Sequence, residues 1–142
     1  MANVIPKEVK KEITDAWKAE TWKACLLTNA FSGQYVSGTH ILYSNISAYE
    51  VASGSGYTTG GVAMSATDKT STVSGTNYVL GATDVQWTGA TFAAVRFVVV
   101  WKDNGALDGP IRAIYEFNAD KAVTSGTFTV EWHADGLIKV SS

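Results

Sequence analysis

The longest apolar segment of the chain covers residues 91–101, TFAAVRFVVVW, and is interrupted by a single charge, Arg96. β-Branched and aromatic residues pack well on a pleated sheet, so this run predicts a buried strand rather than a helix. Thr88-Gly89-Ala90 precedes it and is typical of a tight turn, with Val85 and Trp87 before the turn. We therefore expect two strands joined by a turn, the second of them at the centre of the fold.

The N-terminal residues 6–20 show helical periodicity instead. Pro6 suits the first turn of a helix, where its missing N–H costs little. An apolar stripe lies on one face and lysine, glutamate and aspartate cover the other. Such a helix either packs on the protein's own sheet or docks on a neighbouring subunit. For docking, we expect the partner-binding residues to be Val4, Ile5, Val9, Ile13 and Trp17, with Trp17 the strongest candidate.

The rest of the chain alternates short apolar stretches with glycine-rich turns, which is typical of an antiparallel β protein. The predicted strands are 22–28, 41–43, 62–66, 70–76, 78–81, 111–117, 127–133 and 137–140, with a helical turn within 44–51, a turn at Ser125-Gly126 and loops at 29–40, 53–61 and 103–110. The last two strands are expected to pair as a C-terminal hairpin around residues 134–136. The predicted fold is mainly β, an antiparallel β-sandwich or barrel-like domain (residues 21–142) preceded by an N-terminal helical arm (residues 1–20).

Composition narrows the class further. With 142 residues, 46% hydrophobic and 17% charged, the chain suits one folded domain. A net charge of −2 gives no basic signature of a nucleic-acid partner. The N-terminus is too polar for a signal peptide, and no run approaches the roughly 20 apolar residues that span a bilayer. Cys25 is the one cysteine, so no internal disulfide is possible, and we expect folding in a reducing cytoplasm.

Candidate chemistry is sparse. Cys25 lies in an apolar strand, where a thiol is poorly activated, and the spacing brings neither His40 nor His133 near it. The glycine-rich segment 53–61 is not followed by the lysine that a phosphate-binding loop requires. A loop cluster could bind calcium but is equally a good turn: Asp103, Asn104 and Asp108. The carboxylates that a glycosidase would need show no signature: Glu50, Asp84, Glu116 and Glu131. We expect no enzyme activity and no cofactor.

The aromatic residues allow a second interpretation. Exposed tryptophans on a β-sandwich can stack on sugars, but tryptophans in predicted strands are more typical of a core. Those in predicted strands are Trp22, Trp87, Trp101 and Trp132. Arg96 in the apolar strand would need a carboxylate partner such as Glu116, Glu131 or Asp84, or would have to face solvent or a neighbour.

From Trp17 to the C-terminus, the order of motifs resembles a group of small structural proteins of tailed bacteriophages. The segments that carry the resemblance are WKAETWKACLLTNAF, SAYEVASGSGYTTGGVAM, VQWTGATFAAVRFVVVWKD and FTVEWHADGLIKVS. The most specific part runs from Tyr49 to Gly61, and the C-terminal WHADGLIKV strengthens it. The resemblance implies a non-enzymatic structural role in the virion, after synthesis in the host bacterial cytoplasm.

Within a virion, two roles compete. One is a capsid decoration (cement) protein that binds the major capsid protein lattice. The other is a tail, neck or fibre component, for example a carbohydrate-binding module for host attachment. A single compact domain without heptads or repeats favours cement over a fibre shaft. Many copies, each contacting several subunits, would give strong attachment, and a homo-oligomer such as a trimer on a local three-fold axis suits that role.

Overall fold

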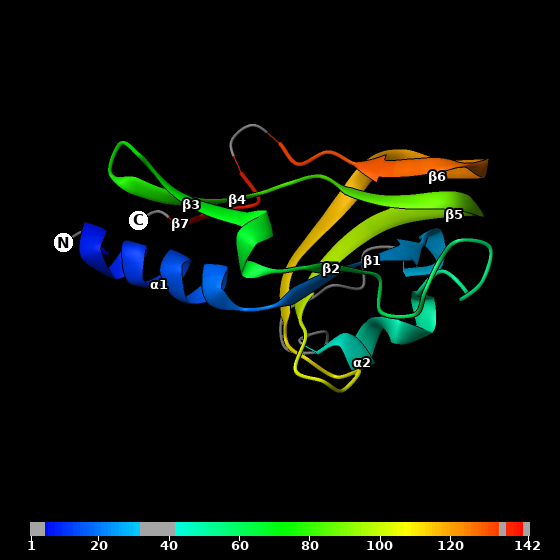
Figure 1. The fold of residues 1–142 in the computed structure, drawn as a ribbon, viewed down its shortest axis with the longest axis horizontal. Coiled ribbons are helices and arrows are strands. Elements are labelled where there is room, and N and C mark those ends of the chain that lie inside the picture. Colours follow the sequence, from blue (N-terminus) through cyan, green and yellow to red (C-terminus); the bar gives the residue numbers. More distant parts are fainter. Residues whose placement is uncertain (1–4, 32–41, 134–135, 141–142) are drawn as a thin grey trace.

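The computed structural model describes residues 5–31, 42–133 and 136–140. The fold is mainly β with antiparallel strands and an N-terminal helix, as predicted. In chain order the elements are α1 (Lys7–Ala19), β1 (Trp22–Thr28), η1 (Asn29–Phe31), α2 (Tyr43–Ile46), η2 (Ser47–Tyr49), β2 (Val62–Met64), η3 (Ala66–Asp68), β3 (Lys69–Ser74), β4 (Asn77–Ala82), β5 (Val85–Lys102), β6 (Ile111–Val130) and β7 (Ile138–Val140). They form a four-stranded and a three-stranded sheet, which lie end to end in Figure 1.

The four-stranded sheet, here called the main sheet, has the strand order β2-β1-β5-β6. Strand β5 contains the apolar run and lies between β1 and β6, which confirms its predicted central place. Alternate β5 residues belong to two separate buried clusters: Val98 and Val100 to one, Phe97, Val99 and Trp101 to the other. Because successive side chains of a strand point to opposite faces, the main sheet is covered on both sides.

The two long strands correct the prediction. The expected turns at residues 88–90 and at Ser125-Gly126 are wrong, because β5 and β6 continue through both positions. Ala90 pairs with Gly126, and the register shifts on both sides of this pair. Gly89 and Ser125 have positive φ angles of 59° and 47°, typical of bulges. The turn-forming residues therefore bend a paired hairpin, whose curvature is visible in Figure 1, instead of ending its strands.

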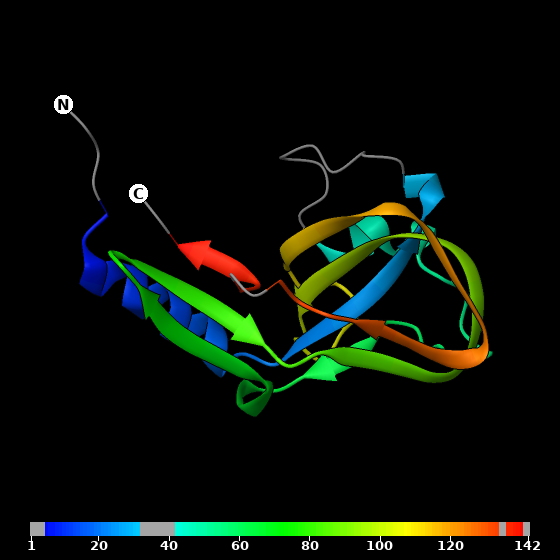
Figure 2. The same cartoon turned by 90° about the horizontal axis from the view of Figure 1, so that it is seen from above.

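The three-stranded sheet has the order β3-β4-β7, and α1 packs along it, as Figure 2 shows. We call α1 with this sheet the helix–sheet unit. The predicted C-terminal hairpin is wrong: β7 pairs with β4, through Leu80 and Ile138, and not with the strand before it. The reason is that β6 ends at Val130, three residues earlier than predicted, so the chain crosses to the other sheet.

Two shorter segments, residues 41–43 and the glycine-rich loop, complete the fold. The predicted strand 41–43 is an isolated bridge between Leu42 and Pro110, and α2 begins directly after it; residue 41 lies outside the described part. The glycine-rich loop at 53–61 places Tyr57 over the core with 2% exposure. Gly61 in that loop has φ +92°, and an added Cβ would lie 1.9 Å from the Ala24 carbonyl oxygen. Only glycine fits there.

Candidate functional site

Helix α1 packs on its sheet through polar side chains. Its two buried residues are Lys10 and Thr14. The Lys10 ammonium donates to the Thr76 carbonyl oxygen at 2.9 Å, and the Ser71 hydroxyl donates to the Thr14 hydroxyl at 2.8 Å. A buried polar interface is stable only when its groups are hydrogen-bonded, and here they are. The side of α1 that faces the sheet is therefore not its apolar side.

The predicted partner-binding residues lie away from this buried side: Ile5 comes just before α1, and Val9, Ile13 and Trp17 lie on the helix. Ile5 and Val9 are 37% and 41% exposed, while Ile13 and Trp17 are half-buried. Val4 lies outside the described residues. Because residues along a helix are about 100° apart, the centre of this stripe is turned by about a quarter of the circumference from the buried Lys10–Thr14 side. The apolar stripe therefore lies partly beside the contact between α1 and its sheet and partly in solvent.

Trp17 lies at the flank, where α1 meets the main sheet. Its ring contacts Trp22 edge-on at 6.3 Å, and the Arg112 guanidinium lies 5.3 Å from its centre. Glu20, at the end of α1, accepts hydrogen bonds from Arg112 at 2.9 and 3.0 Å and from the Trp22 indole at 2.8 Å. Partial burial alone would raise the pKa of Glu20, but these bonds and the nearby Lys102 lower it to about 2. Glu20 joins the helix–sheet unit to the main sheet.

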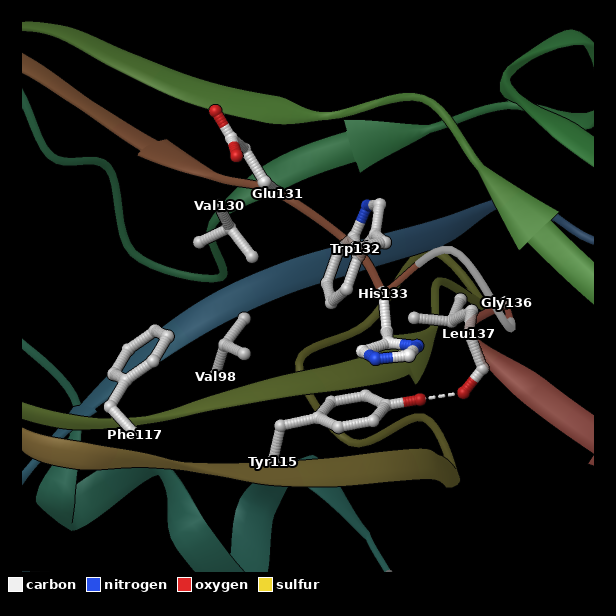
Figure 3. A pocket seen from close by; sticks show the side chains of 9 residues that line it. All are labelled: Val98, Tyr115, Phe117, Val130, Glu131, Trp132, His133, Gly136 and Leu137. Carbon is white, nitrogen blue, oxygen red and sulfur yellow. Dashed lines mark hydrogen bonds between the residues drawn. The ribbon is translucent and has the colours of Figure 1, made fainter.

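A pocket lies at the junction of the two sheets (Figure 3). It has a volume of about 200 Å³. We call it the aromatic pocket; it is lined by Val98, Tyr115, Phe117, Val130, Glu131, Trp132, His133, Gly136 and Leu137. Strands β5 and β6 supply the first four of these residues, and the connection to β7 supplies the others. In Figure 3 the Phe117, Tyr115 and Trp132 rings stand around Val98 and Val130.

The polar atoms of these rings are already bonded to the chain itself. The Tyr115 hydroxyl donates to the Leu137 carbonyl oxygen, and the Trp132 indole N–H donates to the Thr83 carbonyl oxygen at 2.9 Å. Burial raises the pKa of Tyr115 to about 12, so its hydroxyl keeps its proton at neutral pH. The connection is anchored further by the Leu137 amide, which donates to the Leu80 carbonyl oxygen at 2.7 Å. The lining thus combines aromatic and aliphatic surface with two polar side chains, His133, whose ring lies beside Tyr115 in Figure 3, and Glu131.

A second pocket of about 310 Å³ lies beside Glu50. The carboxylate of Glu50 accepts hydrogen bonds from the Tyr43 and Tyr57 hydroxyls and, at 2.9 Å, from the Gly60 amide. Burial, together with this carboxylate, raises the pKa of both phenols above the usual range. The Gly60 carbonyl oxygen accepts from the Trp101 indole at 3.1 Å. Because protonated phenols and a carboxylate that already accepts three bonds are poorly placed for proton transfer, the arrangement serves to fasten the 50–61 segment to the main sheet.

Among the residues that the structure describes, the reactive groups considered from sequence are not assembled into a catalytic set. Cys25 is fully buried, and burial raises the pKa of its thiol well above the ordinary value. His40 lies outside the described residues, and His133 lines the aromatic pocket. Over residues 5–31, 42–133 and 136–140, no three histidine, cysteine or acidic side chains are grouped as metal ligands would be.

The loop cluster proposed for calcium forms a turn. Asp103 accepts from the Gly105 amide at 3.0 Å, and the Asn104 side-chain amide donates to Asp108 at 3.1 Å. These bonds are typical of an Asx turn, and the oxygens are directed to the loop's own donors. Arg96 lies in an ion pair with Glu116 at 3.1 Å, one of the partners expected for it.

The tryptophans follow the core prediction with one difference. Trp22, Trp87 and Trp101 are at most 3% exposed. Trp132 is half-buried, beyond the end of β6, and lines the aromatic pocket. Sequence reasoning missed both this pocket and the bonds around Glu50. The Tyr115 and Phe117 alternation and the Tyr57 position in a glycine-rich loop were signals, but the partners come from distant segments.

Comparison with known proteins leaves the chain unassigned: no family description, curated protein or solved structure matches it. Among the helices in the described residues, none has the length and apolar character that crossing a bilayer requires.

Proposed function

We propose that this chain is a non-enzymatic structural protein of a tailed-bacteriophage virion, a capsid decoration (cement) protein that binds and stabilises the major capsid lattice. The observation that carries a binding role is the orientation of α1: its buried residues are polar, its apolar side is exposed at Val9, and Ile5 is exposed just before the helix. The resemblance of residues 17–142 to phage structural proteins supports the setting.

The apolar stripe of α1 is not what holds the helix on its own sheet. A helix on a sheet is normally held by burying its apolar side. Here that contact uses Lys10 and Thr14, whose hydrogen bonds contribute about 1.5–3 kcal/mol for the charged Lys10 donor and about 0.5–1.5 kcal/mol for the neutral Thr14 pair. Apolar residues placed a quarter turn away contribute most when a second surface covers them. A capsid subunit is the partner we propose, with several copies of this chain, for example a trimer, around a local symmetry axis.

In this role the main sheet is the rigid body, because both of its faces are covered by buried clusters. The helix–sheet unit presents α1 to the lattice, and Glu20 with Arg112 transmits load between the two parts. Each single contact is weak, and many copies with several contacts each would resist the outward pressure of packaged DNA.

The test is binding of the double variant Ile5→Ser/Val9→Ser to empty capsids, measured by co-sedimentation at subsaturating concentration. We expect occupancy to fall at least about tenfold, which corresponds to roughly 1.4 kcal/mol of lost apolar contact. Glu8→Ser, which also changes an exposed α1 side chain, is the matched control and should bind as the unmodified protein does. Far-UV circular dichroism and urea unfolding check that both variants fold. Unchanged occupancy of the folded double variant would refute α1 as the docking element.

The alternative role, a tail, neck or fibre component that binds host carbohydrate, has one observation in its favour: Trp132 and Tyr115 are half-buried aromatic residues beside a pocket. A glycan array separates the two roles. Binding to a defined glycan that Trp132→Ala abolishes, together with no binding to capsids, would support attachment over cement.

A further inference from the structure

We propose that two copies of this chain pair through the outer edges of their β3 strands, antiparallel and about a two-fold axis. The two three-stranded sheets then join into one sheet with the order β7-β4-β3-β3-β4-β7. This inference goes beyond the proposed function and does not depend on a virion, because it rests on backbone geometry and on the charges of α1. It makes a two-fold pair the basic assembly of the chain, instead of the trimer given above as an example.

The outer side of β3 is an uncovered sheet edge. Among the described residues, β4 is the one strand that pairs with β3, and Figure 2 shows no strand beyond it. Sheet edges are usually protected by charged side chains, proline, bulges or very short strands. The register of β3 with β4 is regular over its whole length, and its exposed residues are uncharged: Thr70, Thr72, Val73 and Ser74. This edge carries none of the usual protection.

The other edge strands differ from β3. The register of β6 with β5 shifts at several positions, among them both sides of the Ala90–Gly126 pair. Bulges of this kind twist an edge and interrupt its row of hydrogen-bonding groups. Strands β2 and β7 have three residues each. Strand β3 is therefore the edge that is best suited to pair with another strand.

The register of β3 shows which of its backbone groups point outward. The Thr83 amide donates to the Asp68 carbonyl oxygen at 2.8 Å, and this pair continues the β3–β4 register. Opposed residues of antiparallel strands alternate between pairs that exchange hydrogen bonds and pairs that do not. Counted from Asp68, the even-numbered residues of β3 therefore bond to β4. The amides and carbonyls of Ser71 and Val73 point away from it.

Antiparallel pairing centred on Thr72 uses all of these outward groups. Ser71 of each copy exchanges two hydrogen bonds with Val73 of the other copy, and the two Thr72 residues face each other across the axis. A register centred on Ser71 would instead oppose Val73 to Lys69. The Lys69 amide already donates to the Ala66 carbonyl oxygen, so that register satisfies fewer groups.

Helix α1 lies beside the same edge. It runs antiparallel to β3, because Lys10 bonds to Thr76 beyond the end of the strand, and Lys69 at its start donates to the Glu20 carbonyl oxygen. It contacts both β3 and β4, so its axis lies about 5 Å from the two-fold axis. That axis is perpendicular to the sheet, so both copies of α1 lie on one face, about 10 Å apart, which is a usual distance between packed helices.

The position of α1 along β3 determines which helix residues meet at the axis. Ser71 donates to Thr14 at 2.8 Å and also contacts the Asp15 carboxylate. A residue spans about 3.3 Å in a strand and about 1.5 Å in a helix, so Thr72 lies opposite residues 12–13 of α1. The side of α1 that faces the second copy is therefore the side of Asp15.

The charges nearest the axis are complementary to themselves. Lys11 lies opposite Asp15 of the second copy, and the two residues already form an ion pair within one helix at 2.6 Å. Centring on Ser71 would bring the two Asp15 carboxylates side by side. Complementary charge fixes register and disfavours other partners, which favours a second copy of this chain over an unrelated strand. Val9 lies about 200° around the helix from Lys11 and stays available to another surface. Farther from the axis the charges are of mixed sign and add no preference: Lys7, Glu8 and Lys18.

The first experiment measures self-association of the full-length protein by sedimentation equilibrium. We expect a monomer–dimer equilibrium at concentrations between about 5 µM and 1 mM. Thr72→Lys and Thr72→Glu place like charges face to face at the axis, so each should weaken the dimer at least about tenfold, and an equimolar mixture of the two should restore it. Thr129→Lys, at an exposed position of the edge strand β6, is the matched control and should associate as the unmodified protein does.

Two results of this experiment would overturn the proposal. One is an unmodified protein that stays monomeric up to the highest concentration. The other is a dimer that neither Thr72 variant weakens, or that their mixture does not restore. Far-UV circular dichroism checks that each variant folds, and because Thr72 is exposed, we expect both to fold.

Disulfide trapping tests the register separately. Cys25 is fully buried, so an introduced surface cysteine reacts alone. Facing residues of a non-hydrogen-bonded pair have Cα atoms about 4.5 Å apart, within the range of a disulfide. Thr72→Cys should therefore form a covalent dimer on mild oxidation. Ser74→Cys, also exposed on β3, should not, because it lies about 14 Å from its counterpart. No cross-link at Thr72→Cys, or one at Ser74→Cys of equal yield, would contradict the pairing.

Discussion

The main sheet and the helix–sheet unit are stabilised in different ways. Strands β1 and β5 bury apolar side chains on both faces, from Leu26 and Val98 on one side to Leu27 and Phe97 on the other. The helix–sheet unit buries Val79 and Leu80 of β4, but it also buries three polar or charged residues, Lys10, Thr14 and Lys69. At roughly 25 cal/mol per Å² of apolar surface, the main sheet supplies most of the folding free energy, and the unit depends on hydrogen bonds and on its attachment.

The difference also separates the two parts in their relation to solvent. Of the four large apolar residues that the described part exposes, Ile5, Val9 and Val73 belong to the helix–sheet unit and its N-terminal approach, and Leu107 to the 103–110 loop. The part with the more polar interior is thus also the part that exposes three of these four apolar residues. This pattern is expected of a unit that is completed by a partner, and it suggests where local opening will be easiest.

The largest effect should come from the main sheet. Phe97 is fully buried and contacts Phe31 edge-on at 5.1 Å. Phe97→Ala should lower the free energy of unfolding by about 3–5 kcal/mol, because it removes apolar burial and leaves a cavity. Val73→Ala in β3 should change it by less than about 0.5 kcal/mol. Urea unfolding measures both; a loss below about 1 kcal/mol for Phe97→Ala would contradict the proposed division of stability.

The next effect concerns the joint between the two parts. Glu20→Gln should cost about 2 kcal/mol at pH 7, because it weakens the bonds to Arg112 and Trp22. The pKa of Glu20 is lowered from 4.5 to about 2, so its stabilisation is present above pH 4.5 and is lost as the pH falls toward 2. We expect the difference in the free energy of unfolding between the unmodified protein and Glu20→Gln to shrink as the pH falls from 4.5 to 2, measured by unfolding both proteins between pH 7 and 2. If this difference does not change with pH, the loss of stability comes from packing and not from the charge of Glu20.

A smaller effect is expected inside the helix–sheet unit. Thr14→Ala removes the hydroxyl that accepts the Ser71 hydrogen bond and should cost about 1 kcal/mol. A double-mutant cycle with Ser71→Ala isolates this bond from the changes in helix propensity. Hydrogen exchange should show the loss in α1 and β3 but not in β5. Equal loss of protection in β5 would mean that the two parts unfold together.

The last effect is a pH dependence. Burial lowers the pKa of Lys69 from 10.5 to about 8, despite the opposing influence of Glu20 and Asp68. Between these values the unfolded chain binds more protons than the folded chain, so the free energy of unfolding should rise as the pH increases from about 8. Above pH 10, ionisation of tyrosines in the unfolded chain reverses this trend, since the pKa of Tyr115 is raised in the folded state. Lys69→Met should abolish the rise between pH 8 and 10, and a rise that persists would exclude Lys69 as its source.

Several strands could be predicted from the sequence alone. The apolar run around Val98 predicted the central strand, and residues 22–28 were predicted with the bounds that β1 has. The turn signals at Gly89 and Ser125 misled, because a glycine or a left-handed residue fits a bulge as well as a turn. The choice depends on whether a partner strand lies alongside, which local sequence does not encode.

For the candidate sites, too, the sequence predicted local patterns but not how distant segments pack together. The amphipathic pattern of α1 and its apolar stripe are properties of residue spacing, and so is the alternation that gives Tyr115 and Phe117 a common face on β6. Tertiary contacts decide which side of α1 meets the sheet, for example the contact of Lys10 with Thr76 across more than sixty positions. The pocket beside β6 depends in the same way on the pairing of β7 with β4. Periodicity arises from local backbone geometry, but the direction in which an element faces is decided by the free energy of the whole packed arrangement.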